Sequence, residues 1–194
     1  MESGEEVTLR DGSRVLVRAV RPDDRPLFVA GFQHLSPESR HRRFLYYKKA
    51  LGDRELDFLT NVDHQNHEAI GAVDLTTGNG VAVARMIRED DPEAAEAAVT
   101  VVDEWQGRGL GSLLLERLGE RAREIGVHHF TATLLTSNKA MLAAFHHLGC
   151  VRGHREAGGA EMTIDVEFPT HADDETLATA LRSAAAGHVT ALPS

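Results

Sequence analysis

Cysteine, long apolar runs and positive charge are all scarce in this sequence. Cys150 is the only cysteine, which excludes an intramolecular disulfide and a four-thiolate zinc site. No apolar run approaches the ~18–20 residues that span a bilayer, so we expect no membrane segment. The acidic N-terminus lacks the basic and then apolar pattern of a secretory signal, and the expected compartment is therefore the cytoplasm.

Cations are outnumbered by acids. The chain has 21 Lys and Arg residues against 30 Asp and Glu residues, which gives a formal net charge of −9. Binding to nucleic acid depends on clustered cations that contact phosphates. We therefore do not expect nucleic acid as a partner.

Histidine is frequent, with 11 residues, but its spacing does not favour a metal centre. His64 and His67 lack the H-E-x-x-H pattern of helical zinc sites. The pairs His128-His129 and His146-His147 are sequence neighbours, whose side chains point in different directions. We expect no metal, and we interpret His64 and His67 as loop residues, either simply polar or orienting their loop.

Length and composition predict one main domain. The chain has 194 residues, of which 42% are apolar and 26% charged, and domains average roughly 150 residues. We expect a flexible acidic leader over 1–7, a folded domain over 8–168 and a helical tail over 169–194. The alanine-rich part of the tail is interpreted as either a packed flap or an arm that makes a homodimer.

The hydrophobic pattern predicts a mixed sheet. Strands are expected at 14–20, 68–75, 81–87, 95–102, 130–135 and 161–168, with 68–75 and 81–87 forming an antiparallel hairpin. Helices are expected around 27–32, from 36, and at 51–59, 113–125 and 138–148. This order predicts an α/β fold of the α+β kind, with helices on both faces of the sheet.

A glycine-rich turn joins the expected strand 95–102 to the helix after it. Its glycines are Gly107, Gly109 and Gly111, which would let the backbone approach an anion while the helix start directs N–H groups and a positive dipole end at it. Arg108 would add a cation. The expected ligand is a pyrophosphate, although the spacing fits neither the dinucleotide fingerprint nor the P-loop, and an unliganded turn is the alternative.

The segment Gln106-Gly107-Arg108-Gly109-Leu110-Gly111 resembles the Q/R-x-x-G-x-G/A signature of the GCN5-related N-acetyltransferases. Similarity extends over about residues 8–168, and the stretches 63–69, 95–103 and 138–142 look like the bacterial protein lysine acetyltransferase branch. The resemblance implies a mostly antiparallel sheet that is splayed open, with acetyl-CoA entering the gap.

The resemblance also assigns the cofactor contacts. It implies that backbone groups of Val99, Thr100 and Val101 contact the pantetheine arm, with one N–H polarising the thioester carbonyl. It implies that Gln106 is the first residue of the pyrophosphate site. The rest of that site would be Gly107, Arg108, Gly109, Leu110, Gly111 and Ser112, with Asn138 contacting the cofactor arm.

Acetyl transfer to an amine needs the amine to be neutral. A lysine with a pKa of about 10.4 is neutral in only roughly 0.04% of molecules at pH 7, so a general base is expected. Glu96 matches the catalytic glutamate of the resembling enzymes, and its alanine neighbours could desolvate it, which raises the pKa of a carboxyl group. The alternative is that Glu96 is an ordinary exposed carboxylate. Phe145 occupies the position at which many members of the resembling family carry a tyrosine that acts as the general acid.

The expected function is acetyl-CoA-dependent N-acetylation of a primary amine by direct attack, with a protein lysine as the acceptor. Two alternatives stay open. One is acetylation of a small-molecule amine, and the other is a non-catalytic module that binds acyl-CoA.

Overall fold

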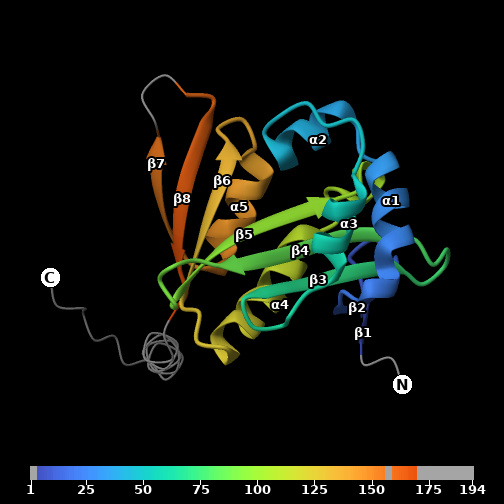
Figure 1. The fold of residues 1–194 in the computed structure, drawn as a ribbon, viewed down its shortest axis with the longest axis horizontal. Helices are drawn as coiled ribbons and strands as arrows, with labels where there is room; N and C mark the ends of the chain where they lie inside the picture. Colours follow the sequence, from blue (N-terminus) through green and yellow to red (C-terminus); the bar gives the residue numbers. More distant parts are fainter. Residues whose placement is uncertain (1–3, 156–158, 170–194) are drawn as a thin grey trace, which may run out of the picture.

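The computed structural model describes residues 4–155 and 159–169, and these form a single sheet flanked by helices (Figure 1). The strands are β1 (Glu5–Thr8), β2 (Arg14–Ala19), β3 (His67–Asp74), β4 (Gly80–Arg88), β5 (Ala94–Val101), β6 (His129–Leu135), β7 (Cys150–Arg155) and β8 (Glu161–Glu167). The α-helices are α1 (Arg25–Gln33), α2 (Pro37–Phe44), α3 (Asp53–Thr60), α4 (Leu110–Glu124) and α5 (Lys139–Leu148).

The sheet is mixed, as the hydrophobic pattern predicts, and mostly antiparallel, as the family resemblance implies. Its strand order is β1-β2-β3-β4-β5-β6-β8-β7, and β3 and β4 form the expected hairpin. Among the described strands the one parallel pair is β5 with β6, and it is paired only from Ala94 to Glu96 on β5. Beyond Glu96 the two strands separate, so the sheet opens along one edge of β5.

Helices cover both faces of the sheet. Helix α4 packs against β3, β4 and β5, and its leucines recur at the three- and four-residue spacing of one buried helical face. These side chains are all fully buried: Leu110, Leu114, Leu115, Leu118 and Ala122. Burial of each leucine contributes roughly 2 kcal/mol. Helices α1 and α3 lie on the opposite face, over β3 and β4 (Figure 1).

Two strands differ from the sequence-based expectation. Residues 5–7, expected to be a flexible leader, belong to β1, which pairs with β2 from Glu5 opposite Val17 to Thr8 opposite Arg14. Arg117 of α4 binds the Glu5 carboxylate at 2.8 and 2.9 Å, so the acidic residue has a cationic partner in the fold. Strand β7 was not predicted because its sequence alternates weakly and it lies at the sheet edge.

Other details concern single residues. Cys150 is exposed at the start of β7. Asp24 is at the N-cap position of α1, but its carboxylate pairs with Arg18 and makes no capping bond to the helix. The expected tail helix, and the dimer arm with it, lies in residues 170–194, outside the described part of the chain. Among the described residues, no helix has the length and apolar character needed to cross a bilayer.

Candidate active site

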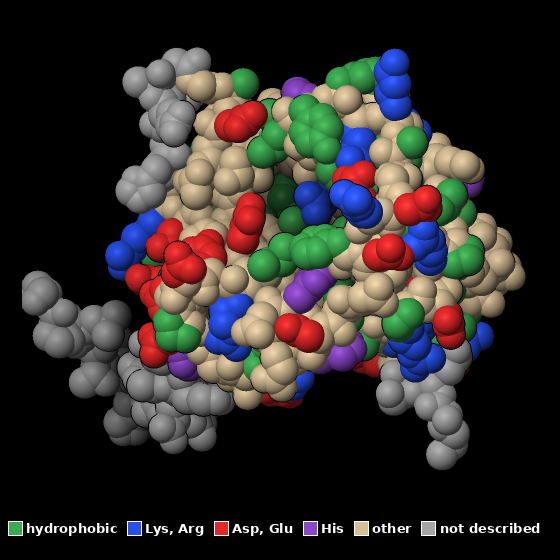
Figure 2. All heavy atoms as spheres, viewed as in Figure 1, with side chains coloured by type: hydrophobic (Ala, Val, Ile, Leu, Met, Phe, Trp, Pro, Cys, Tyr) green, Lys and Arg blue, Asp and Glu red, His purple; other side chains and the backbone are tan. Residues whose placement is uncertain are grey.

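The opening between β5 and β6 holds a cleft of about 480 Å³. Its walls come from α2, the residues 96–101 of β5, the turn at 105–107, the first turn of α4, β6 and α5. Figure 2 shows the molecule hollowed between α2 and β5, with apolar and Lys or Arg side chains in the hollow and acidic ones near its rim. Cavities of 300–1,000 Å³ accommodate small organic ligands and cofactors.

The glycine turn has the backbone geometry that an anion site requires. Gly107 has φ 75° and Gly109 has φ 85°, a left-handed conformation that only glycine adopts readily. Gly109 is the N-cap of α4. The first N–H groups of any α-helix have no intrahelical acceptor, and the helix dipole is positive there. The N–H groups of Leu110, Gly111 and Ser112 are therefore directed into a wall of the cleft.

Of the predicted members of this turn, Gln106 lines the cleft, whereas the Arg108 side chain does not. The Arg108 guanidinium instead pairs with Asp11 at 2.8 Å, bonds Ser13 and lies over the Trp105 ring. The expected extra cation is thus turned away, because β1–β2 residues supply it with a carboxylate. The Gln106 amide nitrogen lies 3.1 Å from both Ser39 Oγ and Val101 O, so Gln106 ties the turn to α2.

Strand β5 presents backbone groups to the cleft at alternate residues. The Val102 N–H donates to Val81 O on the β4 side, and hydrogen-bonding groups of an antiparallel strand alternate between its two edges. Val99 and Val101 therefore face the open edge with their N–H and C=O groups. The Thr100 backbone faces β4, and what Thr100 contributes to the cleft is its side chain.

Glu96 lies where the sheet begins to open. It is the last β5 residue paired with β6, opposite Thr131, and its exposed side chain lines the cleft. The expected desolvation by neighbouring alanines is therefore absent. Phe145 is fully buried in the cleft wall and has no proton to donate.

Asn138 also lines the cleft, at the start of α5. Its side-chain oxygen accepts the Met141 N–H at 3.3 Å, so it caps that helix. The capping contact occupies the oxygen, and the amide NH₂ group is what Asn138 can offer to a ligand.

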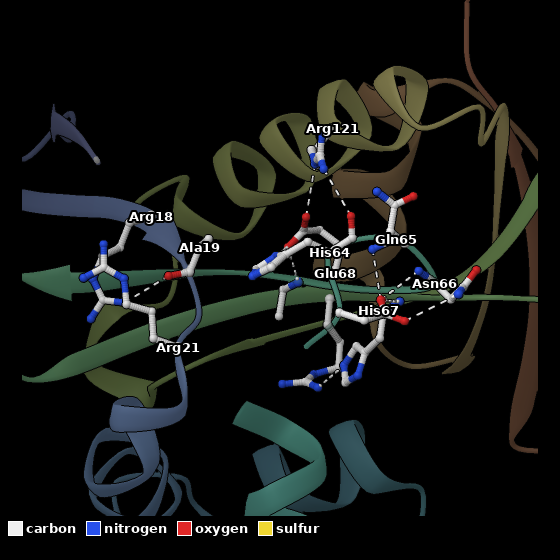
Figure 3. Close-up of polar contacts among 12 residues, drawn as sticks. Arg18, Ala19, Arg21, His64, Gln65, Asn66, His67, Glu68 and Arg121 are labelled. Atoms are coloured by element: carbon white, nitrogen blue, oxygen red, sulfur yellow. Dashed lines mark hydrogen bonds and ion pairs between the residues drawn. The ribbon is translucent and has the colours of Figure 1, made fainter. Parts of the chain in front are cut away.

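The loop 63–67 is organised by side-chain contacts, as Figure 3 shows. Backbone N–H groups of His67 and Gln65 bind the Asp63 carboxylate and lower its pKa to about 2. His64 Nδ1 lies 2.8 Å from the buried Glu68, and Arg121 reaches from α4 to the same carboxylate at 3.1 Å. His64 therefore orients the loop.

His67 points toward the other side of the sheet. Its Nε2 lies 2.7 Å from Arg85, and its ring stacks on Phe58. Burial lowers the His67 pKa to about 4, with Arg85 adding to the effect, so the ring is neutral at pH 7 and accepts the bond. Over residues 4–155 and 159–169, no three His, Cys, Asp or Glu side chains gather as metal ligands would.

Comparison with known proteins decides the family. The family model for the acetyltransferase (GNAT) family matches residues 19–150. This chain belongs to that family. Acetyltransferase Pat of Mycolicibacterium smegmatis is 34% identical over 161 residues, which cover 82% of this chain and 48% of Pat. Acetyltransferase PA5475 of Pseudomonas aeruginosa is 32% identical over 159 residues, covering 81% of this chain and 85% of that protein.

Solved structures agree with this assignment. The GNAT domain of S. lividans PAT has a TM-score of 0.77 and 28% identity, and the match covers 85% of this chain and 97% of that one. A cAMP-binding acyltransferase from Mycobacterium smegmatis has a TM-score of 0.61 and 33% identity, over 89% of this chain and 48% of that one. The chain thus spans about half the length of two of these relatives and nearly all of the S. lividans domain.

Family membership makes acetyl-CoA the acetyl donor, and the described residues fit it. The left-handed glycines at 107 and 109 leave the turn free of side chains, and the α4 N-terminus supplies N–H groups for a pyrophosphate. The open edge of β5 offers backbone groups at Val99 and Val101 for an amide-bearing arm. The cofactor contacts expected from the sequence therefore line one cleft, apart from the Arg108 side chain and the Thr100 backbone.

Proposed function

We propose that this protein transfers the acetyl group of acetyl-CoA to a lysine amine of a protein, with Glu96 as the general base. The observation that carries the proposal is the position of Glu96, exposed in the cleft at the residue where β5 and β6 separate. A carboxylate there lies beside the open edge of β5, where the family places the thioester.

The surroundings of Glu96 favour a cationic acceptor. Thr131 lies opposite Glu96 in register, so the two side chains share a face. The Thr131 hydroxyl donates to Glu89, which brings a second carboxylate to that face. The loop that carries Glu89 is exposed through residues 89–93 and contains four acids. This acidic rim would attract a lysine ammonium group.

The chain supplies two functions to the reaction, a general base and a hydrogen-bond donor to the carbonyl oxygen. When bound, acetyl-CoA supplies an activated acyl carbonyl and a thiolate leaving group, and thiols ionise near pKa 8.5 without a strong acid. Glu96, directly or through water, accepts a proton from the attacking amine. A cleft-facing N–H of Val99 or Val101 donates to the carbonyl oxygen as negative charge develops there. The Phe145 side chain has no proton to donate to the sulfur of the leaving group.

Steady-state acetylation by the Glu96→Gln variant tests the proposal. We expect kcat to fall by about 10²–10⁴-fold, the usual contribution of a general base, while the acetyl-CoA Kd changes less than about twofold. Glu116→Gln, which removes an exposed carboxylate from α4 that lines neither the cleft nor the acidic rim, is the matched control and should retain full activity. Equal kcat values for Glu96→Gln and wild type would remove Glu96 from the mechanism.

The acceptor class is tested with the wild-type protein. A panel of lysine-containing proteins, lysine peptides, polyamines and amino acids should give the highest kcat/KM for a protein lysine. A preference for a small amine would favour the alternative acceptor. Binding of acetyl-CoA without turnover on any amine would instead favour a non-catalytic acyl-CoA-binding module.

A further inference from the structure

Arg85 is a buried cation that lacks an acidic partner. It lies in the middle of β4 with only 4% of its surface exposed. Its guanidinium donates to neutral His67 at 2.7 Å and to Leu59 O at 2.9 Å, and it lies over the Phe28 ring. Burial, with the Arg43 charge adding to the effect, lowers the Arg85 pKa to about 9, so Arg85 stays charged at pH 7.

A second guanidinium lies near the first. Arg43, at the end of α2, is partly buried; burial lowers its pKa, while Glu96 and Tyr46 oppose that effect. Within the described ranges, no Asp or Glu oxygen comes within 4.0 Å of Arg43 or Arg85, although other arginines form such pairs. Burying a charge without a close counter-ion costs several kcal/mol, and two adjacent cations add to that cost.

Both arginines line a small chamber next to the cleft. The chamber has a volume of about 100 Å³ and lies between the sheet and helices α1 and α3. Its walls are mostly apolar, and they also include Arg18 and Asp24, which neutralise each other in an ion pair at 2.6 Å. The apolar wall residues include Leu27, Phe28, Phe32, Leu51, Leu59 and Val83. It shares Leu35, Arg43, Phe44 and Thr100 with the cleft, so the two spaces adjoin.

The register of the sheet places this chamber beside the proposed base. Arg85 on β4 lies opposite Ala98 on β5. Because Ala98 is two residues after Glu96, the side chains of Arg85, Ala98 and Glu96 are all on the same face of the sheet. Arg43 lines the cleft together with Glu96 and the chamber together with Arg85. A ligand in the chamber would thus be close to the reacting groups.

We propose that the chamber binds a carboxylate carried on a short apolar chain, with Arg43 and Arg85 as its ligands. A planar carboxylate accepts two parallel bonds from a guanidinium fork, and it would neutralise the uncompensated charge. The apolar walls suit a few methylene groups, and the volume is roughly a third of that of the smallest drug-sized pockets. A nucleotide or sugar would not fit.

The carboxylate has two sources. It is either the far end of a dicarboxylic acyl chain on coenzyme A or part of a separate small molecule, such as an amino acid acceptor. The acyl source rests on the proposed function and leaves its chemistry unchanged: the amine nitrogen bonds to the thioester carbon, the carbon–sulfur bond breaks, the amine proton goes to Glu96 and the thiolate departs. The distal carboxylate takes no part in the bond changes.

Calorimetric binding to the full chain tests the site without requiring turnover. Succinyl-CoA and butyryl-CoA have acyl chains of four carbons and differ at the end, carboxylate against methyl. If the acyl chain is the source, succinyl-CoA binds at least tenfold more tightly, and the preference falls below twofold in Arg43→Gln and Arg85→Met. If a separate molecule is the source, butyrate binds the CoA-saturated protein and the same variants weaken it at least tenfold.

Arg54→Gln removes an exposed cation from α3, outside both cavities, and should leave both readouts unchanged. If Arg85→Met does not fold, the partly exposed Arg43→Gln decides alone. The proposal is overturned if wild type shows neither a succinyl preference nor butyrate binding, or if the variants change neither. Measuring the same ratio in Glu96→Gln separates this result from the proposed catalysis, since that variant should keep the preference even if no amine is acetylated.

Discussion

The two sides of β5 offer different kinds of group to a ligand. On the donor side, the glycine turn and the open strand edge offer backbone N–H groups, and the Arg108 side chain is turned away to Asp11. On the opposite side, Glu96, Arg43 and Arg85 offer charged side chains from three separate elements. Backbone recognition suits a donor common to a family, whereas side chains can be exchanged singly and suit a ligand that varies between members.

The strongest test of this contrast on the donor side is Gly109→Val. A β-branched residue is strained at φ 85° and would displace the turn. We expect the acetyl-CoA Kd to rise about 10–100-fold in a calorimetric titration. The matched control is Gly126→Val, since Gly126 also has a left-handed φ, of 81°, but lies after the other end of α4 and outside the cleft. An equal loss in both variants would mean that α4 packing, rather than turn conformation, determines binding.

A smaller effect is expected from His67 on the other side of the sheet. Its folded pKa of about 4 lies below the unfolded value of 6.5, so the unfolded chain binds the proton more readily between those values. Stability is therefore full above pH 6.5 and falls as pH falls toward 4, by on the order of 1–2 kcal/mol between pH 7 and pH 5.

Urea unfolding across that pH range measures the His67 contribution. His67→Gln keeps a side-chain acceptor for Arg85 but does not titrate, so its stability should change less between pH 7 and pH 5. Identical pH slopes for the variant and wild type would show that His67 is not held neutral beside Arg85.

The smallest effect concerns β1, none of whose residues lines the cleft or the chamber. Two guanidinium nitrogens of Arg117, on α4, donate to the Glu5 carboxylate, on β1. Exposed ion pairs contribute up to about 1 kcal/mol, so Glu5→Gln should lower the free energy of unfolding by less than that and leave acetyl-CoA binding unchanged. Faster amide exchange in β1 of the variant would locate the loss; a change in acetyl-CoA affinity would contradict the separation of β1 from the site.

The donor side could largely be predicted from the sequence, because its signals are local. Glycines at 107 and 109 specify the turn, and the leucine spacing after them specifies α4. The hairpin of β3 and β4 is equally local. What local signals could not give was the direction of the Arg108 side chain, since it depends on Asp11, far away in the sequence.

The opposite side could not be predicted in the same way. In the sequence, Arg85 is a single polar residue within an expected strand, and Arg43 is one of several cations in a basic helix. Neither pattern distinguishes these residues from ordinary surface arginines. Only the pairing of β4 with β5 and the packing of α2 over them bring these arginines to Glu96. Strand β1 was missed for a similar reason, because its acidic residues are stabilised by Arg14 and Arg117, which lie elsewhere in the sequence.

Binding of the donor in two lengths tests the central claim most directly. Titration of the protein with acetyl-CoA and with S-acetylpantetheine, which lacks the pyrophosphate and the nucleotide, isolates the part assigned to the α4 N-terminus. We predict that wild type binds acetyl-CoA at least 100-fold more tightly and that Gly109→Val loses most of this difference. Equal affinity of wild type for the two compounds would contradict the account.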